Sequence, residues 1–230
     1  REVTRQFNAM LDQIDQLMAD VRRQEETTRQ YQLQALSSQI NPHFLYNTLD
    51  TIIWMAEFQD SQRVVQVTKS LATYFRLALN RGKDLISLSD EINHVRQYLF
   101  IQKQRYGDKL EYEINENPAF DKLVLPKLVL QPLVENALYH GIKEKEGQGH
   151  IRVSVQKQDS GLVIRIEDDG VGFQDAGDSS QSQLKRGGVG LQNVDQRLKL
   201  HFGEDYQMKI DSALKKGTTV KIYINRIETS

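Results

Sequence analysis

The stretch Asp168-Asp169-Gly170-Val171-Gly172 follows an apolar strand pattern and combines two carboxylates with two glycines. A carboxylate that ends a strand is held rigidly, so Asp168 could accept a hydrogen bond from the amino group of an adenine. Gly170 and Gly172 have no side chains, so the backbone there can turn sharply and approach a flat base closely. By itself, the stretch is equally compatible with a tight surface turn whose carboxylates are solvated.

Two motifs flank this stretch and favour the binding interpretation. Upstream, Glu135-Asn136-Ala137 lies in an expected helix, where the Asn136 carbonyl oxygen is a suitable ligand for a Mg²⁺ ion that carries phosphate oxygens. Downstream, Gly188-Val189-Gly190-Leu191 opens a helix whose N-terminal amides favour phosphate groups. In this order the three motifs predict a site for ATP and Mg²⁺.

The polar stretch from Phe173 to Gly187 has the composition of a mobile lid, being rich in Ser, Gln, Asp and Gly. Lys185 near its end could reach the triphosphate, and His140, one helical turn after Asn136, could line the pocket. Competing phosphate motifs are absent from the sequence. There is no G-x-x-x-x-G-K-[ST], and Gly188-Val189-Gly190 does not follow a strand as a dinucleotide fingerprint does.

Apolar periodicity predicts an α+β fold for the second part of the chain. Alternation predicts five strands: 110–114, 151–156, 162–166 and two more that carry Met208, Ile210 and Val220, Ile222, Ile224. Helices are expected after the capping-box sequence at Ser87, over 126–140 with a kink or break at Pro132, and after Gly190. Helices with mostly hairpin-linked strands indicate a two-layer α/β sandwich rather than a doubly wound parallel sheet.

The first part of the chain is predicted to be helical. Apolar residues recur there at heptad spacing, which favours a coiled coil between two copies: Val3, Phe7, Met10, Ile14, Leu17 and Val21. The alternative is one solvated helix whose stripe packs on its own domain. Pro42 interrupts this pattern, and apolar-faced helices over 44–55 and 64–78 follow, with Arg81-Gly82 as the stop signal. This hairpin is too small to bury its own stripe, so a dimeric four-helix bundle is expected.

Composition excludes several classes of function. The 230 residues are 39% hydrophobic and 27% charged, as in ordinary globular proteins, and a formal net charge of −1 predicts no binding of nucleic acid. The chain has no cysteine, which excludes disulfides and thiolate metal sites and fits a reducing compartment. No apolar run approaches the ~18 residues that span a bilayer, and no signal peptide is visible. Because the chain opens on Arg1, a fragment of a longer protein is expected.

The segment from Glu135 to Gly217 resembles the GHKL (Bergerat-type) ATPase domain shared by histidine kinases, gyrase-type ATPases and Hsp90. The string Gln39-Ile-Asn-Pro-His43-Phe-Leu-Tyr-Asn47 is similar to that of sensor histidine kinases of the LytS/YesM type, as are Leu130–Ala137 and Gly188–Val194. Phe7–Ile14 resembles the last helix of a HAMP signalling module. Together these similarities cover nearly the whole chain.

The resemblance implies a bacterial two-component kinase made of three parts: a signalling helix at 1–31, a dimerisation and phosphotransfer hairpin at 32–82, and an ATP-binding domain at 83–230. It implies that His43 accepts the γ-phosphoryl group of ATP and passes it to an aspartate in the receiver domain of a response regulator, which docks near 50–67. It also implies that Asn136 binds Mg²⁺, that Asp168 reads the adenine and that Thr218 supports it. Such a chain would be the cytoplasmic portion of a homodimeric cell-membrane protein, tied to the membrane only by segments outside it.

Two positions depart from the GHKL pattern. Pro132 stands where many relatives have a carboxylate or amide four residues before the asparagine, which leaves Glu135 as a possible base or ligand. Tyr139 stands where many histidine kinases have a lysine, so Lys143 or Lys185 would have to serve the phosphates. Two other functions stay open: a clamp-type ATPase without a phosphoprotein, and a dimeric scaffold that binds nucleotide without turnover.

The remaining histidines give no metal-binding pattern. We expect His94, His150 and His201 at the surface or at helix ends, and no pair of histidines has a convincing metal spacing. Because Pro42 directly precedes His43, it would bend or loosen the helix and let an upstream signal change how the histidine is presented.

Overall fold

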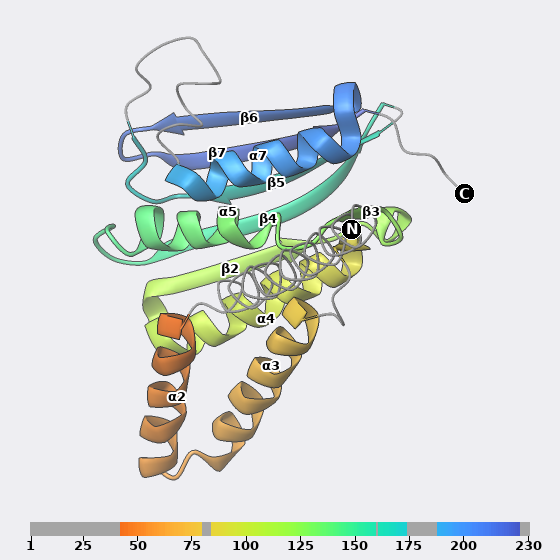
Figure 1. The fold of residues 1–230 in the computed structure, drawn as a ribbon. Coiled ribbons are helices and arrows are strands. Elements are labelled where there is room, and N and C mark those ends of the chain that lie inside the picture. The colour runs from red at the N-terminus through yellow and green to blue at the C-terminus, as the bar shows by residue number, and fades with distance from the viewer. Residues whose placement is uncertain (1–41, 80–83, 160, 174–187, 226–230) are drawn as a thin grey trace, which may run out of the picture. The chain divides into compact units, whose positions relative to one another are not determined.

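The computed structural model describes residues 42–79, 84–159, 161–173 and 188–225 (Figure 1). The predicted heptads, the stop signal at Arg81-Gly82, Lys185 and nearly all of the expected lid lie outside these residues. The chain divides into two compact units, Arg1–Tyr46 and Asn47–Ser230. Among the described helices, none is long and apolar enough to cross a bilayer.

The predicted hairpin helices are present as α2 (Pro42–Glu57) and α3 (Ser61–Leu79). Pro42 is the first described residue of α2, and His43 follows it directly. Asp60 precedes α3 and its carboxylate accepts the backbone N–H of Arg63 at 3.2 Å, as an N-capping residue does.

Helix α3 packs along α4 (Leu88–Tyr106) through four buried residues: Val67, Leu71, Tyr74 and Ala78. The Ser87 hydroxyl accepts the backbone N–H of Asp90 at 3.1 Å, which confirms the predicted cap of α4. A short antiparallel pair of strands flanks this helix, β1 (Leu85–Ser87) with β3 (Val124–Pro126). Three residues are too few to show alternation, so these two strands were not predicted.

The five predicted strands are confirmed and form one sheet in the order β2-β4-β5-β7-β6. Their bounds are Leu110–Asn115 (β2), Gly149–Gln158 (β4), Gly161–Asp168 (β5), Tyr206–Ala213 (β6) and Gly217–Ile224 (β7). The β2–β4 pair is parallel, whereas the other three pairs are antiparallel.

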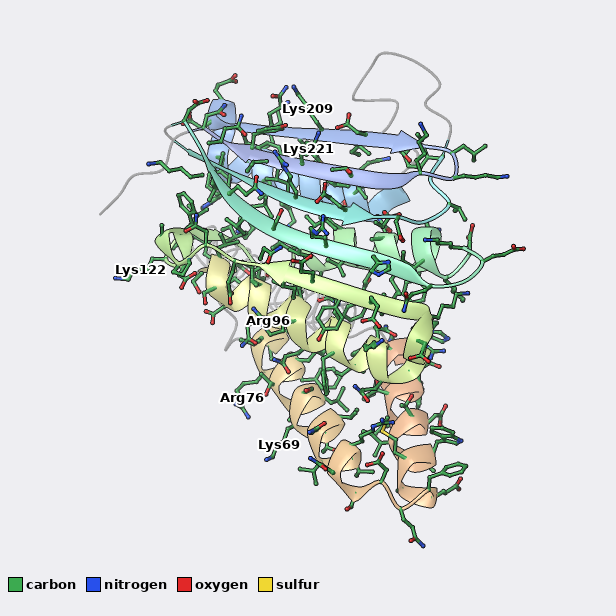
Figure 2. The ribbon with its side chains drawn as sticks, turned by 180° about the vertical axis from the view of Figure 1, so that it is seen from behind. Lys69, Arg76, Arg96, Lys122, Lys209 and Lys221 are labelled. Carbon is green, nitrogen blue, oxygen red and sulfur yellow. The ribbon has the colours of Figure 1, made fainter. Side chains whose placement is uncertain are left out.

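Helices cover one face of this sheet, namely α4, α5 (Gln131–Asn136) and α7 (Gly188–Phe202) (Figure 1). Seen from behind, the other face carries charged side chains, including Lys209 and Lys221 (Figure 2). The result is a helical layer on a mixed sheet, an α+β arrangement whose core lies between the two layers.

The helix predicted over 126–140 is wrong in its first part. Pro126 ends β3, a loop follows, and α5 begins only at Gln131. Pro132 lies in the first turn of α5, where proline is tolerated, so it neither kinks nor breaks the helix. The chain then continues as a π-helical segment, Ala137–Ile142.

A buried carboxylate holds the loop that leads into α5. Glu91 of α4 is 0% exposed, and its two oxygens accept the backbone N–H groups of Leu128 at 2.9 Å and Leu130 at 2.8 Å. Both N–H groups precede the first residue of α5, so Glu91 fixes the loop that leads into the helix. Its partners are separated from it by 37 and 39 residues, which is why no local pattern predicted this start.

Candidate nucleotide-binding site

A cavity of about 280 Å³ lies among α5, the π-helical segment, α7 and the sheet. Its walls are mainly apolar and are formed by Leu133, Ala137, Ile166, Phe173, Leu191, Ile210 and Val220. Four polar side chains also line it: Asn136, His140, Asp168 and Thr218. A mostly apolar cavity with a few convergent polar groups is typical of a site for a small organic ligand such as a base.

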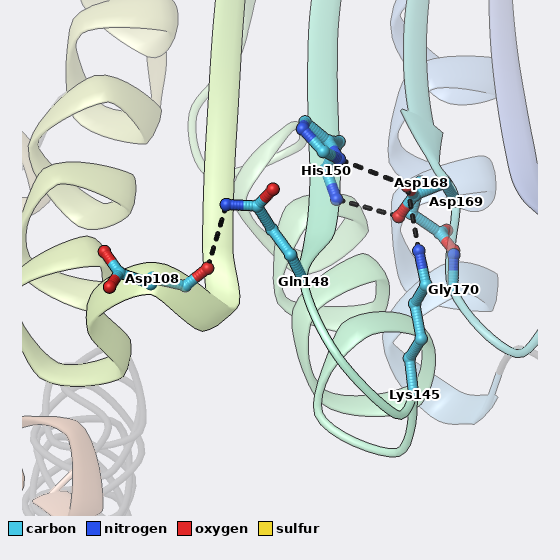
Figure 3. Close-up of polar contacts among 7 residues, drawn as sticks. All are labelled: Asp108, Lys145, Gln148, His150, Asp168, Asp169 and Gly170. Atoms are coloured by element: carbon cyan, nitrogen blue, oxygen red, sulfur yellow. Dashed lines mark hydrogen bonds and ion pairs between the residues drawn. The ribbon is translucent and has the colours of Figure 1, made fainter.

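Asp168 is the acidic residue in this lining, and the structure places it at the end of β5. Its Oδ1 accepts the backbone N–H of Gly170 at 2.9 Å (Figure 3), and it pairs in register with Thr218 on β7. Burial raises the pKa of this carboxyl to about 6, although hydrogen bonds from the backbone of Gly170 and Thr218 act in the opposite direction. The ionised form is therefore poorly solvated, and a donor in the cavity would stabilise it.

Close backbone packing fixes the position of Asp168. A Cβ atom on Gly141 would lie 2.5 Å from Asp168 Oδ1, and one on Gly170 would lie 2.3 Å from the Gly141 Cα. Only glycine at both positions lets the π-helical segment and the turn meet without an intervening side chain. Gly141 was not among the predicted site residues, and its nearness to His140 in the sequence was the only hint of its role.

Asp169 is not part of the cavity lining and ties the turn to β4. Its carboxylate accepts the backbone N–H of His150 at 2.7 Å and lies 2.9 Å from Lys145 Nζ and 3.2 Å from His150 Nδ1 (Figure 3). Burial alone would raise the pKa of Asp169, but these partners outweigh it, so the pKa lies below its usual value. Two adjacent carboxylates thus have opposite shifts, because one faces an apolar cavity and the other faces donors.

Asn136 is the last residue of α5 and lines the cavity, whereas the preceding Glu135 is not part of that lining. The Glu135 carboxylate instead accepts the Gln131 side-chain N–H at 2.8 Å, and burial raises its pKa against the effect of this bond. Among the described residues no cluster of three or more His, Cys, Asp or Glu side chains could hold a metal. A neutral amide oxygen alone fits an ion held mainly by phosphate oxygens.

The other predicted nucleotide contacts line the cavity, lie elsewhere in the structure or fall outside the described residues. Leu191 and Thr218 line the cavity, and the Thr218 hydroxyl is 2.9 Å from that of Ser212. Gly172 also lines it, while Gly188 is the first residue of α7 and Gly190 is exposed. Of the cations considered, Lys143 places its ammonium 5.7 Å from the centroid of the Tyr139 ring.

Comparison with known proteins decides the family. The family model "Histidine kinase" matches residues 31–110, and the model "Histidine kinase-, DNA gyrase B-, and HSP90-like ATPase" matches residues 123–227. The chain belongs to the histidine kinases of the LytS/YesM type. The second match contains every residue that lines the cavity, so the cavity lies in the region that resembles these ATPases.

Several relatives align along most of the length of this chain. It is 33% identical to "Sensor histidine kinase YesM" of Bacillus subtilis over 96% of this chain and 38% of that protein. It is 30% identical to "Sensor protein LytS" of the same species over 94% of this chain and 37% of that protein. It is 36% identical to the uncharacterized protein YwpD, also of Bacillus subtilis, over 85% of this chain and 70% of that protein. The chain therefore spans little more than a third of the named sensor relatives.

The histidine that precedes this matched region lies in the first described residues of α2. His43 is exposed there, directly after Pro42. The apolar residues Leu49, Ile53 and Trp54 on the same helix are also exposed, at 41%, 57% and 58% of their surface. Exposed large apolar side chains in such a group usually mark an interaction surface.

The prediction for His94 is wrong, because the residue is only 1% exposed. Its ring stacks on Tyr74 of α3, with centroids 4.4 Å apart and planes 14° apart. Burial lowers the pKa of His94 to about 4, so the ring is neutral near pH 7. Helix α4 packs against both α3 and the sheet, and a helix that is buried on two sides places polar residues in the interior as well. His150, at the start of β4, and His201, near the end of α7, are exposed as predicted.

Proposed function

We propose that this chain is the catalytic portion of a sensor kinase, which phosphorylates its own His43 from Mg·ATP and passes the phosphoryl group to an aspartate of a response regulator. The observation that carries this proposal is the apolar cavity in which Asn136, Asp168 and Thr218 converge. The family of the chain and the exposed position of His43 on α2 support the same conclusion.

In this proposal the adenine occupies the cavity. Asp168 accepts a hydrogen bond from the exocyclic amino group, and Thr218 supports the same edge of the base. Gly172 and Leu191 line the cavity beside the base, whereas Gly170 packs on the backbone of Gly141 and holds the turn in place. His140 lies beside this pocket as a further contact.

The triphosphate would extend toward the start of α7. There Gly188 and Gly190 present backbone N–H groups to the phosphates, and Lys185 supplies a positive charge. Asn136 would provide the protein's oxygen ligand to Mg²⁺, and a bound ion would neutralise charge on the phosphate oxygens.

The transfer itself requires few protein groups. A neutral ring nitrogen of His43 attacks the γ-phosphorus, the bond from that phosphorus to the β–γ bridging oxygen breaks, and ADP leaves. Catalysis then depends mainly on alignment and charge stabilisation. Glu135 is the candidate acceptor for the proton that the imidazole loses.

The hairpin would act as a homodimer. The exposed stripe formed by Tyr46, Leu49 and Ile53 recurs at spacings of three and four, which is the pattern of a helix that packs in a bundle. We propose that two copies bury it in a four-helix bundle that the coiled coil of 1–31 continues, and that the regulator docks along 50–67. The sensor relatives suggest the cytoplasmic side of a membrane protein as its location.

Incubation with γ-labelled ATP and Mg²⁺ tests this function in the wild-type chain and in His43→Ala, Asn136→Ala and the control His201→Ala. We expect an acid-labile, base-stable label that falls more than about 100-fold in the first two variants and is unchanged in the control. His43→Ala should still bind ATP. Label that survives in His43→Ala would place the acceptor elsewhere. Steady ADP release without label would favour the clamp ATPase, and binding without turnover would favour the scaffold.

A further inference from the structure

Two hydrogen bonds in series connect α3 of the hairpin to α5 of the ATP-binding region. The Gln131 side-chain amide donates one N–H to the Tyr74 hydroxyl at 2.5 Å and the other to Glu135 Oε1 at 2.8 Å. Both amide hydrogens are therefore used, one toward the hairpin and one toward the acid beside Asn136. We call Tyr74, Gln131 and Glu135 the α3–α5 link.

The link is held in a tightly packed environment. Tyr74 is 1% exposed and Gln131 is 8% exposed, so water cannot readily replace either partner. The Tyr74 ring stacks on the buried His94 ring of α4, and neither His94 nitrogen has a hydrogen-bond partner among the described residues. In this position the imidazole acts as a flat apolar platform that fixes the plane of the tyrosine ring.

Helix α5 continues directly into the π-helical segment Ala137–Ile142, so only its first turn lacks a helical neighbour. The N–H groups of a first turn have no partners within the helix, so the orientation of this end depends on tertiary contacts. Glu91 of α4 holds the backbone before its start, while Tyr74 holds a side chain of its first turn. The first anchor belongs to the ATP-binding region, whereas the second belongs to the hairpin.

We propose that Tyr74 is a positioning residue for phosphoryl transfer, which acts through Gln131 to orient Glu135 beside Asn136. The inference rests on the proposed kinase function and assigns to the hairpin a direct contact with the catalytic helix. Without the Tyr74 hydroxyl, the buried Gln131 amide has an unused N–H, turns to find another acceptor and releases Glu135. Movement of α3 would have the same effect, so α5 senses the position of the hairpin helix.

Tyr74→Phe tests this proposal, because it removes the hydroxyl and retains the ring that stacks on His94. We expect the rate of His43 labelling at saturating ATP to fall about tenfold, while the dissociation constant for ATP changes less than about twofold. The matched control is Tyr206→Phe, which removes a hydroxyl that donates to Asp195 Oδ1 at 2.8 Å, outside the link. Equal effects of the two substitutions on the rate would overturn the proposal.

A double-mutant cycle tests whether Tyr74 acts through Gln131. Gln131→Met removes both donors at nearly constant volume, so adding Tyr74→Phe should lower the rate less than about twofold further. If the two effects multiply instead, Tyr74 acts by another route and the proposal fails. A purely structural defect would lower ATP binding in parallel with the rate, which the same measurements would show.

Amide hydrogen exchange separates failure of this inference from failure of the proposed function. Tyr74→Phe should speed exchange at 131–137 relative to the wild type, and Tyr206→Phe should not. If the wild-type chain is not labelled on His43, the kinase function fails, but the exchange result still shows whether Tyr74 holds α5. Unchanged exchange in Tyr74→Phe would refute the link even in an active kinase.

Discussion

The proposed adenine site around Asp168 and the region around His43 differ in how their residues are held. Asp168 lies between backbone segments that touch directly, with Gly141 and Gly170 in close contact and Asp169 tied to β4. His43 lies exposed on the first turn of a helix whose apolar stripe is also exposed. The described cavity is lined by residues of one chain, whereas we propose that a second copy covers the exposed stripe.

The difference has a physical consequence for regulation. A carboxylate packed against backbone has little room to move, so we expect the proposed nucleotide recognition to vary little. In the proposed bundle, a helix surface covered by another copy could change its packing by small shifts, and presentation of the histidine would then vary with an upstream signal. Three substitutions and a change of pH should reveal this contrast, each with a smaller effect than the one before.

A charged residue in the exposed apolar stripe of α2 should weaken dimerisation and leave ATP binding unchanged. In Ile53→Asp, the carboxylate would have to be buried in the proposed four-helix bundle, so we expect dimerisation to weaken more than about 100-fold. ATP affinity should not change, because residue 53 is not part of the cavity. Light scattering and nucleotide titration check both parts. Gln66→Glu, at an exposed polar position of α3, is the control, and a fully dimeric Ile53→Asp would contradict the proposed bundle.

Removal of the charge on Asp168 should weaken ATP binding and leave dimerisation unchanged. Asp168→Asn retains the size of the side chain but replaces a carboxylate oxygen with an amide, so ATP binding should weaken roughly tenfold to 100-fold. Titration with ATP, and with GTP as a nucleotide lacking the adenine amino group, measures the effect. We expect ATP to lose its advantage over GTP, and a variant that keeps full preference for ATP would exclude Asp168 as the reader.

A methyl group on Gly141 should also weaken ATP binding, because it would displace the Asp168 carboxylate. In Gly141→Ala the new Cβ would lie 2.5 Å from Asp168 Oδ1, so the carboxylate must move and ATP binding should weaken about fivefold. Gly147→Ala is the contrasting variant, since Gly147 has a φ of 80° and its new Cβ would have no neighbouring atom within 4 Å. It should lower thermal stability through backbone strain and leave ATP affinity intact. Equal affinity of both variants would argue against a tightly fixed Asp168.

Acidification should produce the smallest change. Because burial raises the pKa of Asp168 to about 6, the carboxyl gains a proton as the pH falls through that value and can no longer accept the adenine amino group in its charged form. Between about pH 7.5 and 5.5 the ionised fraction falls about fourfold, and ATP affinity should fall about fourfold with it.

Protonation of Asp168 should lower ATP affinity but raise the stability of the folded protein. The pKa of Asp168 in the folded protein lies above its ordinary value of 3.8, so protonation adds stability to the empty protein as the pH falls from about 6 toward 4. Asp168→Asn should remove both trends, and thermal unfolding and titration at several pH values measure them. Persistence of the binding trend in Asp168→Asn would assign it to another group.

Much of the fold and of the candidate site followed from local patterns in the sequence. Alternation predicted the five strands, the cap at Ser87 predicted the start of α4, and Asp168-x-Gly-x-Gly with Asn136 predicted most polar groups of the cavity. The strands and the cap could be predicted because each depends on residues close together in the sequence, where backbone geometry is set by neighbours. The structure brings Asn136 and Asp168 into one cavity, and their roles there stay predictions.

Only the tertiary structure decided which distant residues meet. It placed Gly141 against Asp168, used Glu91 to hold the start of α5, buried His94 under Tyr74 and joined Tyr74 to Gln131. The false helix start at Pro126 has the same origin, because the loop before Gln131 is stabilised by an acid 39 residues away from Leu130. Periodicity reports which face of an element is buried, but the partner on that face is selected by the packing of the whole fold.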